Sequence, residues 1–106
     1  MSLSVTKQGD TVTIVVRGQL VVGNRQALKQ RVLYEIDGGA RNFVLDFGET
    51  GQVDSSGLGV LVSLAKKLRE VGGELRLANL SGDLKALFEV TKLHTVLPIH
   101  ESGKGS

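Results

Sequence analysis

The stretch Val-Asp-Ser-Ser-Gly-Leu-Gly-Val-Leu-Val, residues 53–62, is the most informative part of the chain. Asp54, Ser55 and Ser56 carry oxygens that can accept hydrogen bonds from the free amides of a first helical turn. Apolar residues at helical spacing follow, and Gly72-Gly73 can end a helix. The stretch therefore predicts a long helix from about residue 56 to residue 71, with hydroxyl groups at its amino end.

This helix would be apolar on two sides. One stripe can face a sheet, and it consists of Leu58, Leu61, Val62, Ala65 and Leu68. Val60 and Leu64 lie on another side, where a helix covering one face of a sheet should be polar. The pattern leaves two interpretations open: Val60 and Leu64 form a partner surface, or neighbouring helices bury them.

Strands are expected on both sides of this helix. Residues 43–47 are mostly apolar, which is typical of a buried central strand, and a polar loop is expected from residue 48 to residue 53. Residues 74–78 alternate as a further strand, and Ser81 can cap a short helix that carries Leu84, Leu87 and Phe88. Residues 96–99 predict an edge strand, because Pro98 is tolerated only where no amide donor is needed.

The amino-terminal part predicts a hairpin followed by a helix. Residues 3–7 alternate, residues 8–10 have turn chemistry, and residues 12–18 are rich in β-branched side chains. Asn24 can cap a helix that ends at Gly38-Gly39. The order β-β-α-β-α-β-α-β predicts one α/β domain: a mixed, mostly parallel sheet with an antiparallel amino-terminal hairpin and helices packed on it. We expect the domain to span residues 1–101 and residues 102–106 to be a flexible tail.

Composition excludes several classes of function. The 106 residues include no Cys, so disulfides, thiolate nucleophiles and cysteine-based metal sites are excluded. The net charge is only +2, and the densest basic cluster, Lys66-Lys67 with Arg69, is expected to be the solvated face of a helix rather than a nucleic-acid contact. Without a membrane-spanning run or a hydrophobic signal core, we expect a cytoplasmic protein that is not inserted in a membrane.

The chain also lacks the residues that an enzyme would need. His94 and His100 lie near the carboxyl terminus, and no histidine occurs near Ser55 or Ser56 to activate a hydroxyl. Gly57-Leu58-Gly59 begins like a dinucleotide fingerprint, but Val62 occupies the third small position. We therefore expect no catalytic residues, no metal site and no cofactor.

A phosphoryl group on Ser55 would nevertheless have a large effect on binding. It would bring a charge of roughly −1.5 to −2 to a helix amino terminus, where the helix dipole favours an anion by ~0.3–1 kcal/mol. Burying the same charge unpaired in an interface costs several kcal/mol. Such a serine can therefore switch binding off without unfolding its own domain.

These residues resemble those of the STAS-domain proteins of the bacterial anti-sigma factor antagonist family, over about residues 3–99. The most specific part is the run from Asp54 to Gly59, placed after a buried strand and a short loop. Gly18-Gln19-Leu20, Asn24 with Leu28, and Gly72-Gly73 followed by a strand also fit the family pattern.

The resemblance implies a mechanism for this chain. The unphosphorylated protein would bind an anti-sigma factor that is itself a serine kinase, which frees the sigma factor. The kinase would phosphorylate Ser55 with ATP, the complex would dissociate, and a serine phosphatase would reset the cycle. The residues expected to contact the partner are Val22, Gly23, Asn24, Asp54, Ser56, Gly57, Leu58 and Val60.

The chain departs from the family pattern at two places. Val21 stands where family members commonly carry an acidic residue near the kinase contact, and residues 101–106 form a polar tail in place of a further helix. An uncovered sheet face would favour weak self-association. Val21 also favours an alternative, a structural STAS subunit of a lipid-transport ABC complex that holds an ATPase permanently. An enzyme acting on small phosphorylated substrates is a third hypothesis, disfavoured because no base lies near Ser55 in the sequence.

Overall fold

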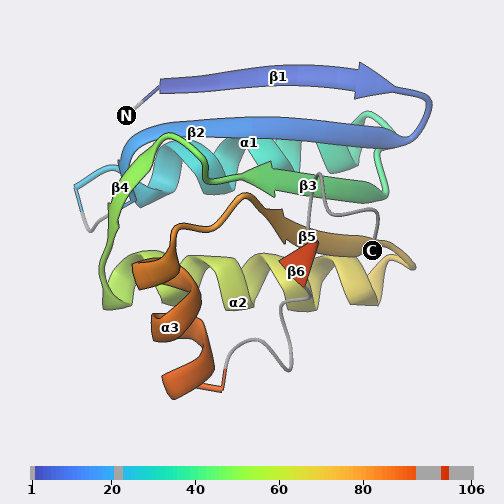
Figure 1. Ribbon diagram of the computed structural model, residues 1–106. Coiled ribbons are helices and arrows are strands. Elements are labelled where there is room, and N and C mark those ends of the chain that lie inside the picture. The colour runs from blue at the N-terminus through green and yellow to red at the C-terminus, as the bar shows by residue number, and fades with distance from the viewer. Residues whose placement is uncertain (1, 21–22, 93–98, 101–106) are drawn as a thin grey trace.

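The computed structural model describes residues 2–20, 23–92 and 99–100 (Figure 1). In these ranges the chain forms a mixed sheet with three helices. The elements in chain order are β1 (Ser2–Gln8), β2 (Thr11–Leu20), α1 (Arg25–Asp37), β3 (Asn42–Asp46), β4 (Thr50–Val53), α2 (Ser55–Glu70), β5 (Glu74–Ala78), α3 (Gly82–Val90) and β6 (Ile99–His100).

The sheet has the order β1-β2-β3-β5-β6, and β4 pairs with the carboxyl end of β2. β1 and β2 form an antiparallel hairpin that turns at Gly9, whose φ of +63° suits glycine. All other pairings are parallel. The carboxyl ends of β2, β3 and β5 therefore lie at the same end of the sheet, and α2 begins at this end.

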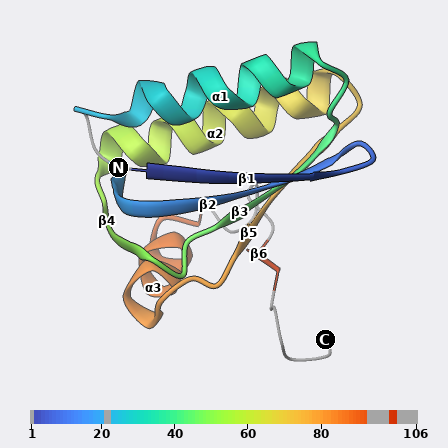
Figure 2. The same ribbon diagram turned by 90° about the horizontal axis from the view of Figure 1, so that it is seen from above.

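One face of the sheet carries the main core. Side chains along β2, β3 and β5 alternate between buried and partly exposed, as expected when helices cover one face. α1 and α2 lie side by side on that face, and α3 lies on the opposite face (Figure 2). The strand residues of the core are Val12, Ile14, Val16, Leu20, Phe43, Leu45, Val53, Leu75 and Leu77.

The predicted fold class is confirmed, with two differences in detail. Residues 50–53 form strand β4, where the sequence indicated only a polar loop. Tertiary hydrogen bonds hold this segment: the Thr50 hydroxyl donates to the Val16 carbonyl (2.6 Å), and the Gly18 amide donates to the Glu49 carbonyl (3.0 Å). Asn24 precedes α1 as predicted, but its side chain makes no capping hydrogen bond. Residues 96–98 of the predicted edge strand and the tail 102–106 lie outside the described residues.

A buried carboxylate connects α1 to the hairpin. The Glu35 side chain is 3% exposed and accepts hydrogen bonds from Lys7 Nζ (3.1 Å) and Arg31 Nε (3.0 Å). Burial by itself raises the pKa of the Glu35 carboxyl, but the two cations outweigh burial and hold the pKa below its ordinary value.

We expect this lowered pKa to appear in the pH dependence of stability. A carboxyl whose pKa is lower in the folded state stabilises the protein above its ordinary pKa, and this contribution is lost as the pH falls through the folded-state value. Glu35→Gln should therefore unfold more easily than wild type at pH 7, by about 1 kcal/mol for an ion pair with partly exposed cations. The difference should shrink on acidification below pH 4, as measured by urea unfolding. A difference that stays constant from pH 7 to pH 3 would contradict this assignment.

Candidate functional site

The amino end of α2 presents Ser55 to solvent. Asp54 is the cap residue: its Oδ1 accepts a hydrogen bond from the Gly57 amide (2.9 Å), and its carbonyl accepts from the Leu58 amide (3.0 Å). Asp54 therefore performs the capping role that the sequence left open between Asp54, Ser55 and Ser56. Ser55 is the first helical residue and is exposed, while Ser56 and Leu58 are half-buried. We call Asp54, Ser55, Ser56 and Leu58 the α2-start surface.

The strands hold the α2-start surface in place. The Asp54 amide donates to the Leu20 carbonyl (3.2 Å), and Leu20 pairs with Val53 of β4. Gly57 packs directly against the end of β2, because a Cβ atom at position 57 would lie 2.4 Å from the Leu20 carbonyl oxygen. The first turn of α2 is thus fixed to the sheet on its inner side, and only its outer side is open.

The loop before α1 lies at the same end of the molecule. Gly23 is exposed and Asn24 is half-buried, directly before α1 begins at Arg25. α1 and α2 begin at the same end, next to β4 (Figure 2). Gly23 and Asn24 therefore lie at the end of the fold that carries Ser55, as expected. Val22, which was also expected in the partner contact, lies outside the described residues.

The chain matches a known protein family over almost its whole length. The family model described as "STAS domain" matches residues 2–104. This chain belongs to the STAS domain family. Its curated relatives include the anti-sigma-B factor antagonist of Bacillus subtilis, 27% identical over 105 residues, with 99% of this chain and 95% of the relative covered. The anti-sigma-B factor antagonist of Listeria monocytogenes is 34% identical over 103 residues, with 93% and 90% covered.

Solved structures share the fold of this STAS domain. The anti-sigma factor antagonist SpoIIAA in its unphosphorylated form matches with a TM-score of 0.76 and 20% identity, covering 97% of this chain and 91% of SpoIIAA. The phosphorylated form of SpoIIAA from Bacillus matches with a TM-score of 0.74 and 21% identity, covering 95% and 93%. At this identity the likeness shows that the arrangement of helices and strands is the same.

Two of the expected contact residues, Val60 and Gly57, are buried in this STAS domain. Val60 is 7% exposed, and Leu64 on the same side of α2 is 1% exposed; both belong to the hydrophobic core. The alternative that this side of α2 is buried within the fold is confirmed, so Val60 has little surface to offer a partner. At Gly57 the absence of a side chain lets α2 approach the Leu20 carbonyl of β2.

Two exposed residues near the α2-start surface were not among the residues predicted from the sequence. Gln19 in β2 and Gln52 in β4 are exposed, and Gln19 Nε2 donates to Gln52 Oε1 at 3.4 Å. They precede Leu20 and Val53, the pair that holds the start of α2. Gln19 lies within the Gly18-Gln19-Leu20 motif, which was a usable signal. Gln52 could not be found, because β4 was not predicted.

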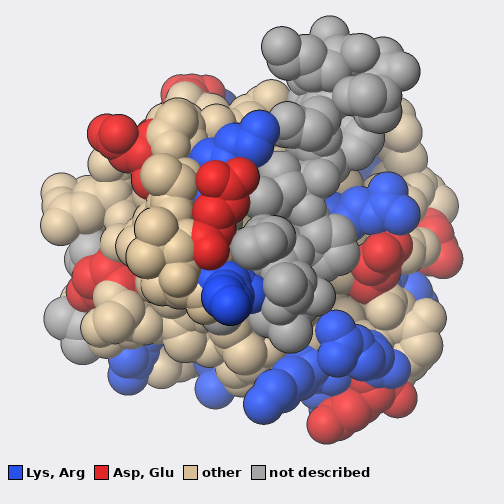
Figure 3. Space-filling model, turned by 60° about the horizontal axis from the view of Figure 1, so that its bottom comes forward, with Lys and Arg blue, Asp and Glu red and all other residues tan. Residues whose placement is uncertain are grey.

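The described residues hold no cluster of side chains that could bind a metal ion. Within residues 2–20, 23–92 and 99–100, no group of three or more His, Cys, Asp or Glu side chains could hold a metal ion. In the same ranges, no helix is both long enough and apolar enough to cross a membrane. The predicted solvated face of α2 is confirmed, since Lys66, Lys67 and Arg69 are exposed; basic and acidic groups lie next to each other on this side of the molecule (Figure 3).

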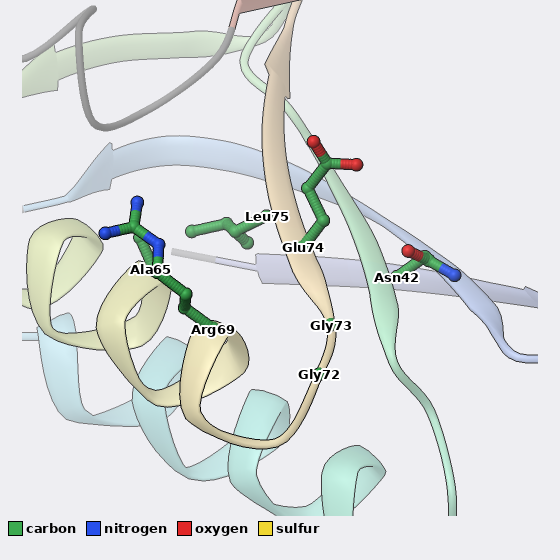
Figure 4. A pocket seen from close by; sticks show the side chains of 7 residues that line it. All are labelled: Asn42, Ala65, Arg69, Gly72, Gly73, Glu74 and Leu75. Carbon is green, nitrogen blue, oxygen red and sulfur yellow. The ribbon is translucent and has the colours of Figure 1, made fainter.

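A cavity of about 380 Å³ lies at the opposite end of the sheet, and it does not form a convincing site. Its polar side chains are Arg69, Glu74 and Asn42, which point in different directions rather than at a common ligand (Figure 4). The Glu74 carboxylate instead accepts from Arg76 (2.9 Å). Asn42 and Glu74 are the first residues of β3 and β5, so this cavity is also far from Ser55 along the strands.

The capping role of Asp54 has a measurable consequence. We expect Asp54→Ala to lower the free energy of unfolding by about 1 kcal/mol, the usual cost of losing a helix cap. Asp54→Asn keeps an oxygen that can accept from the Gly57 amide. Its free energy of unfolding should fall by only a few tenths of a kcal/mol, because the negative charge that the helix dipole favours is removed. Thermal unfolding of both variants tests this ranking, and equal losses for alanine and asparagine would show that capping is not the main role.

Proposed function

We propose that this STAS domain is an anti-sigma factor antagonist whose α2-start surface binds an anti-sigma factor with serine kinase activity. In this proposal the kinase phosphorylates Ser55 using ATP, the complex dissociates, and a serine phosphatase restores the binding form. The cycle would take place in the bacterial cytoplasm. The family and the names of the relatives support the antagonist function.

The observation that carries the proposal is the exposure of Ser55 beside a separate cap. Because Asp54 accepts the hydrogen bond from the Gly57 amide, the Ser55 hydroxyl is not needed to start α2. Ser55 can therefore be modified without loss of the cap, and the amino end of the helix tolerates the added negative charge. A partner that covers Ser55 would instead have to bury that charge.

Phosphate mapping tests the proposal. The protein is incubated with ATP and each histidine-kinase-like anti-sigma factor encoded in its own genome, and the product is mapped by mass spectrometry. We expect one phosphoryl group on Ser55, none on the Ser55→Ala variant, and unchanged labelling of Ser56→Ala. Failure of every such kinase to label Ser55, or labelling of Ser56 instead, would contradict the proposal.

The alternative of a permanently bound transporter subunit is favoured by one observation, the presence of Val21 in place of an acidic residue. In that case the same surface would hold an ATPase without a phosphorylation step. Affinity capture with the full chain separates the two: an ABC ATPase whose binding is unaffected by Ser55→Asp would support the transporter subunit. Capture of a kinase that dissociates after ATP is added would support the antagonist.

A further inference from the structure

β1 is an edge strand with an unprotected outer side. In the described part of the chain nothing pairs with that side; β1 is the outermost strand in Figure 1, and Figure 2 looks onto its open side. All seven residues of β1 pair with β2 in one continuous register, without a bulge and without a proline. Natural proteins usually protect such an edge with a bulge, a proline or an outward-pointing charge.

The hairpin turn determines which backbone groups of β1 face outward. Gln8 and Thr11 flank the two-residue turn, and such flanking residues form a hydrogen-bonded pair. Because bonded and non-bonded pairs alternate along an antiparallel ladder, Ser2, Ser4, Thr6 and Gln8 bond to β2. The amides and carbonyls of Leu3, Val5 and Lys7 therefore point away from the sheet and can pair with another strand.

The single charged side chain of β1 does not protect this edge. Lys7 donates to Glu35 of α1 at 3.1 Å, so its ammonium group is drawn over the helix-covered face of the sheet. Leu3 and Val5 share that face and pack against the core as partly buried side chains. Residues 2–6 of β1 thus carry no charged side chain of their own, and the charged group next to them is the Arg17 guanidinium of β2, which donates to the Ser4 hydroxyl on the other face.

An exposed aromatic residue lies beside the same edge. Tyr34 of α1 is 67% exposed, and the Arg31 guanidinium lies 5.7 Å from the centre of its ring. Arg31 also binds Glu35 (2.9 Å), which reaches Lys7 in β1. Because these contacts run from Tyr34 through Arg31 and Glu35 to Lys7, Tyr34 lies on the side of α1 that is nearer to β1. Tyrosine and arginine are both enriched in protein interfaces.

We propose that a second copy of this chain pairs with β1, antiparallel, about a two-fold axis at Ser4. In this register Leu3 faces Val5 of the second copy, and Ser2 faces Thr6 of the second copy. Apolar residues meet on the helix-covered face and hydroxyl groups meet on the other face, so the strand is complementary to itself. No two charges of β1 face each other, and five residues from each copy extend the sheet across the axis.

The helix layer fits the same arrangement. α1 lies behind β2 and β3 (Figure 1), so continuing the sheet through β1 places the two α1 helices on the same face, one on each side of the axis. The Tyr34 sides of the two helices would then face each other across the axis. α2 lies beyond α1, against β4 and β5, so Ser55 would remain open in both copies.

Paired charge variants at Ser2 and Thr6 test both the dimer and its register. Both residues are exposed, so neither substitution removes a buried side chain. Ser2→Lys with Thr6→Lys puts two lysine pairs across the axis, and we expect it to weaken the dimer about tenfold. Ser2→Lys with Thr6→Glu puts two opposite-charge pairs there and should bind at least as tightly as wild type. Sedimentation velocity from 5 µM to about 1 mM protein measures the dissociation constants, expected between ~10 µM and ~1 mM for a small interface.

Two further readouts make the test decisive. Thermal unfolding at low concentration should show that both double variants remain folded. In the wild type, the amides of Leu3 and Val5 should exchange more slowly as the protein concentration rises, while the Ser55 amide should not change. A wild type that stays monomeric at about 1 mM, or two charge variants with equal dissociation constants, would overturn the proposal. None of these measurements requires an anti-sigma factor, so they are independent of the proposed function.

Discussion

Replacing Gly57 with alanine is expected to lower the free energy of unfolding by about 2 kcal/mol, as overpacking of a close contact does. In an open helix position the same substitution would stabilise the protein by ~1 kcal/mol. At Gly57 the new Cβ would lie 2.4 Å from the Leu20 carbonyl oxygen and 3.0 Å from side-chain atoms of Leu20 and Val53. A backbone oxygen cannot rotate away, so α2 must shift from β2, and the clash outweighs the gain in helix propensity.

Gly59→Ala is the matched control, because it lies in the same helix with nothing within 4 Å of its Cβ position. We expect this variant to be more stable than wild type by ~0.5–1 kcal/mol. Thermal unfolding should therefore separate the two variants by roughly 10 °C or more for a domain of this size. If both alanines raise the unfolding temperature, the contact between Gly57 and Leu20 does not hold the start of α2.

Ser55→Asp is expected to weaken binding of the anti-sigma factor at least about 100-fold, which corresponds to ~2.7 kcal/mol. Within the free domain, a negative charge at the first turn of α2 is favoured by the helix dipole, so the unfolding temperature should not fall. Under the partner the charge would lose water without gaining a counter-charge, which costs several kcal/mol. The effect should therefore appear in binding and not in stability.

Ser63→Asp provides the comparison, because Ser63 is exposed on the same helix about two turns from Ser55. It adds the same charge to the protein but lies outside the α2-start surface, so affinity should change less than about threefold. Ser55→Ala should bind as tightly as wild type, since the cap is provided by Asp54. Isothermal titration with the purified kinase measures all three variants. Equal affinities for Ser55→Asp and wild type would refute the switch.

Apart from β4, the order of helices and strands was predictable, and so was the start of α2 near Ser55, because these features depend on local patterns. Alternating residues in β2, the apolar run of β3 and the capping chemistry before α2 each act within a few neighbouring residues. The motif from Asp54 to Gly59 also placed Ser55 at a helix start. These features require no knowledge of which segments meet in space.

Tertiary packing decided what the sequence left open. Val60 belongs to the core because α1 lies beside α2. Residues 50–53 form a strand because they pair with the end of β2, where the Val16 carbonyl accepts a hydrogen bond from the Thr50 hydroxyl. The sequence alone determined the α/β fold class and the position of Asp54, Ser55 and Ser56 at the start of a long helix. Only the folded structure decided that α2 is buried on the side of Val60 and Leu64 as well, and which edge of the sheet is open. The physical reason is that burial depends on two surfaces in contact, whereas a sequence pattern describes only one of them.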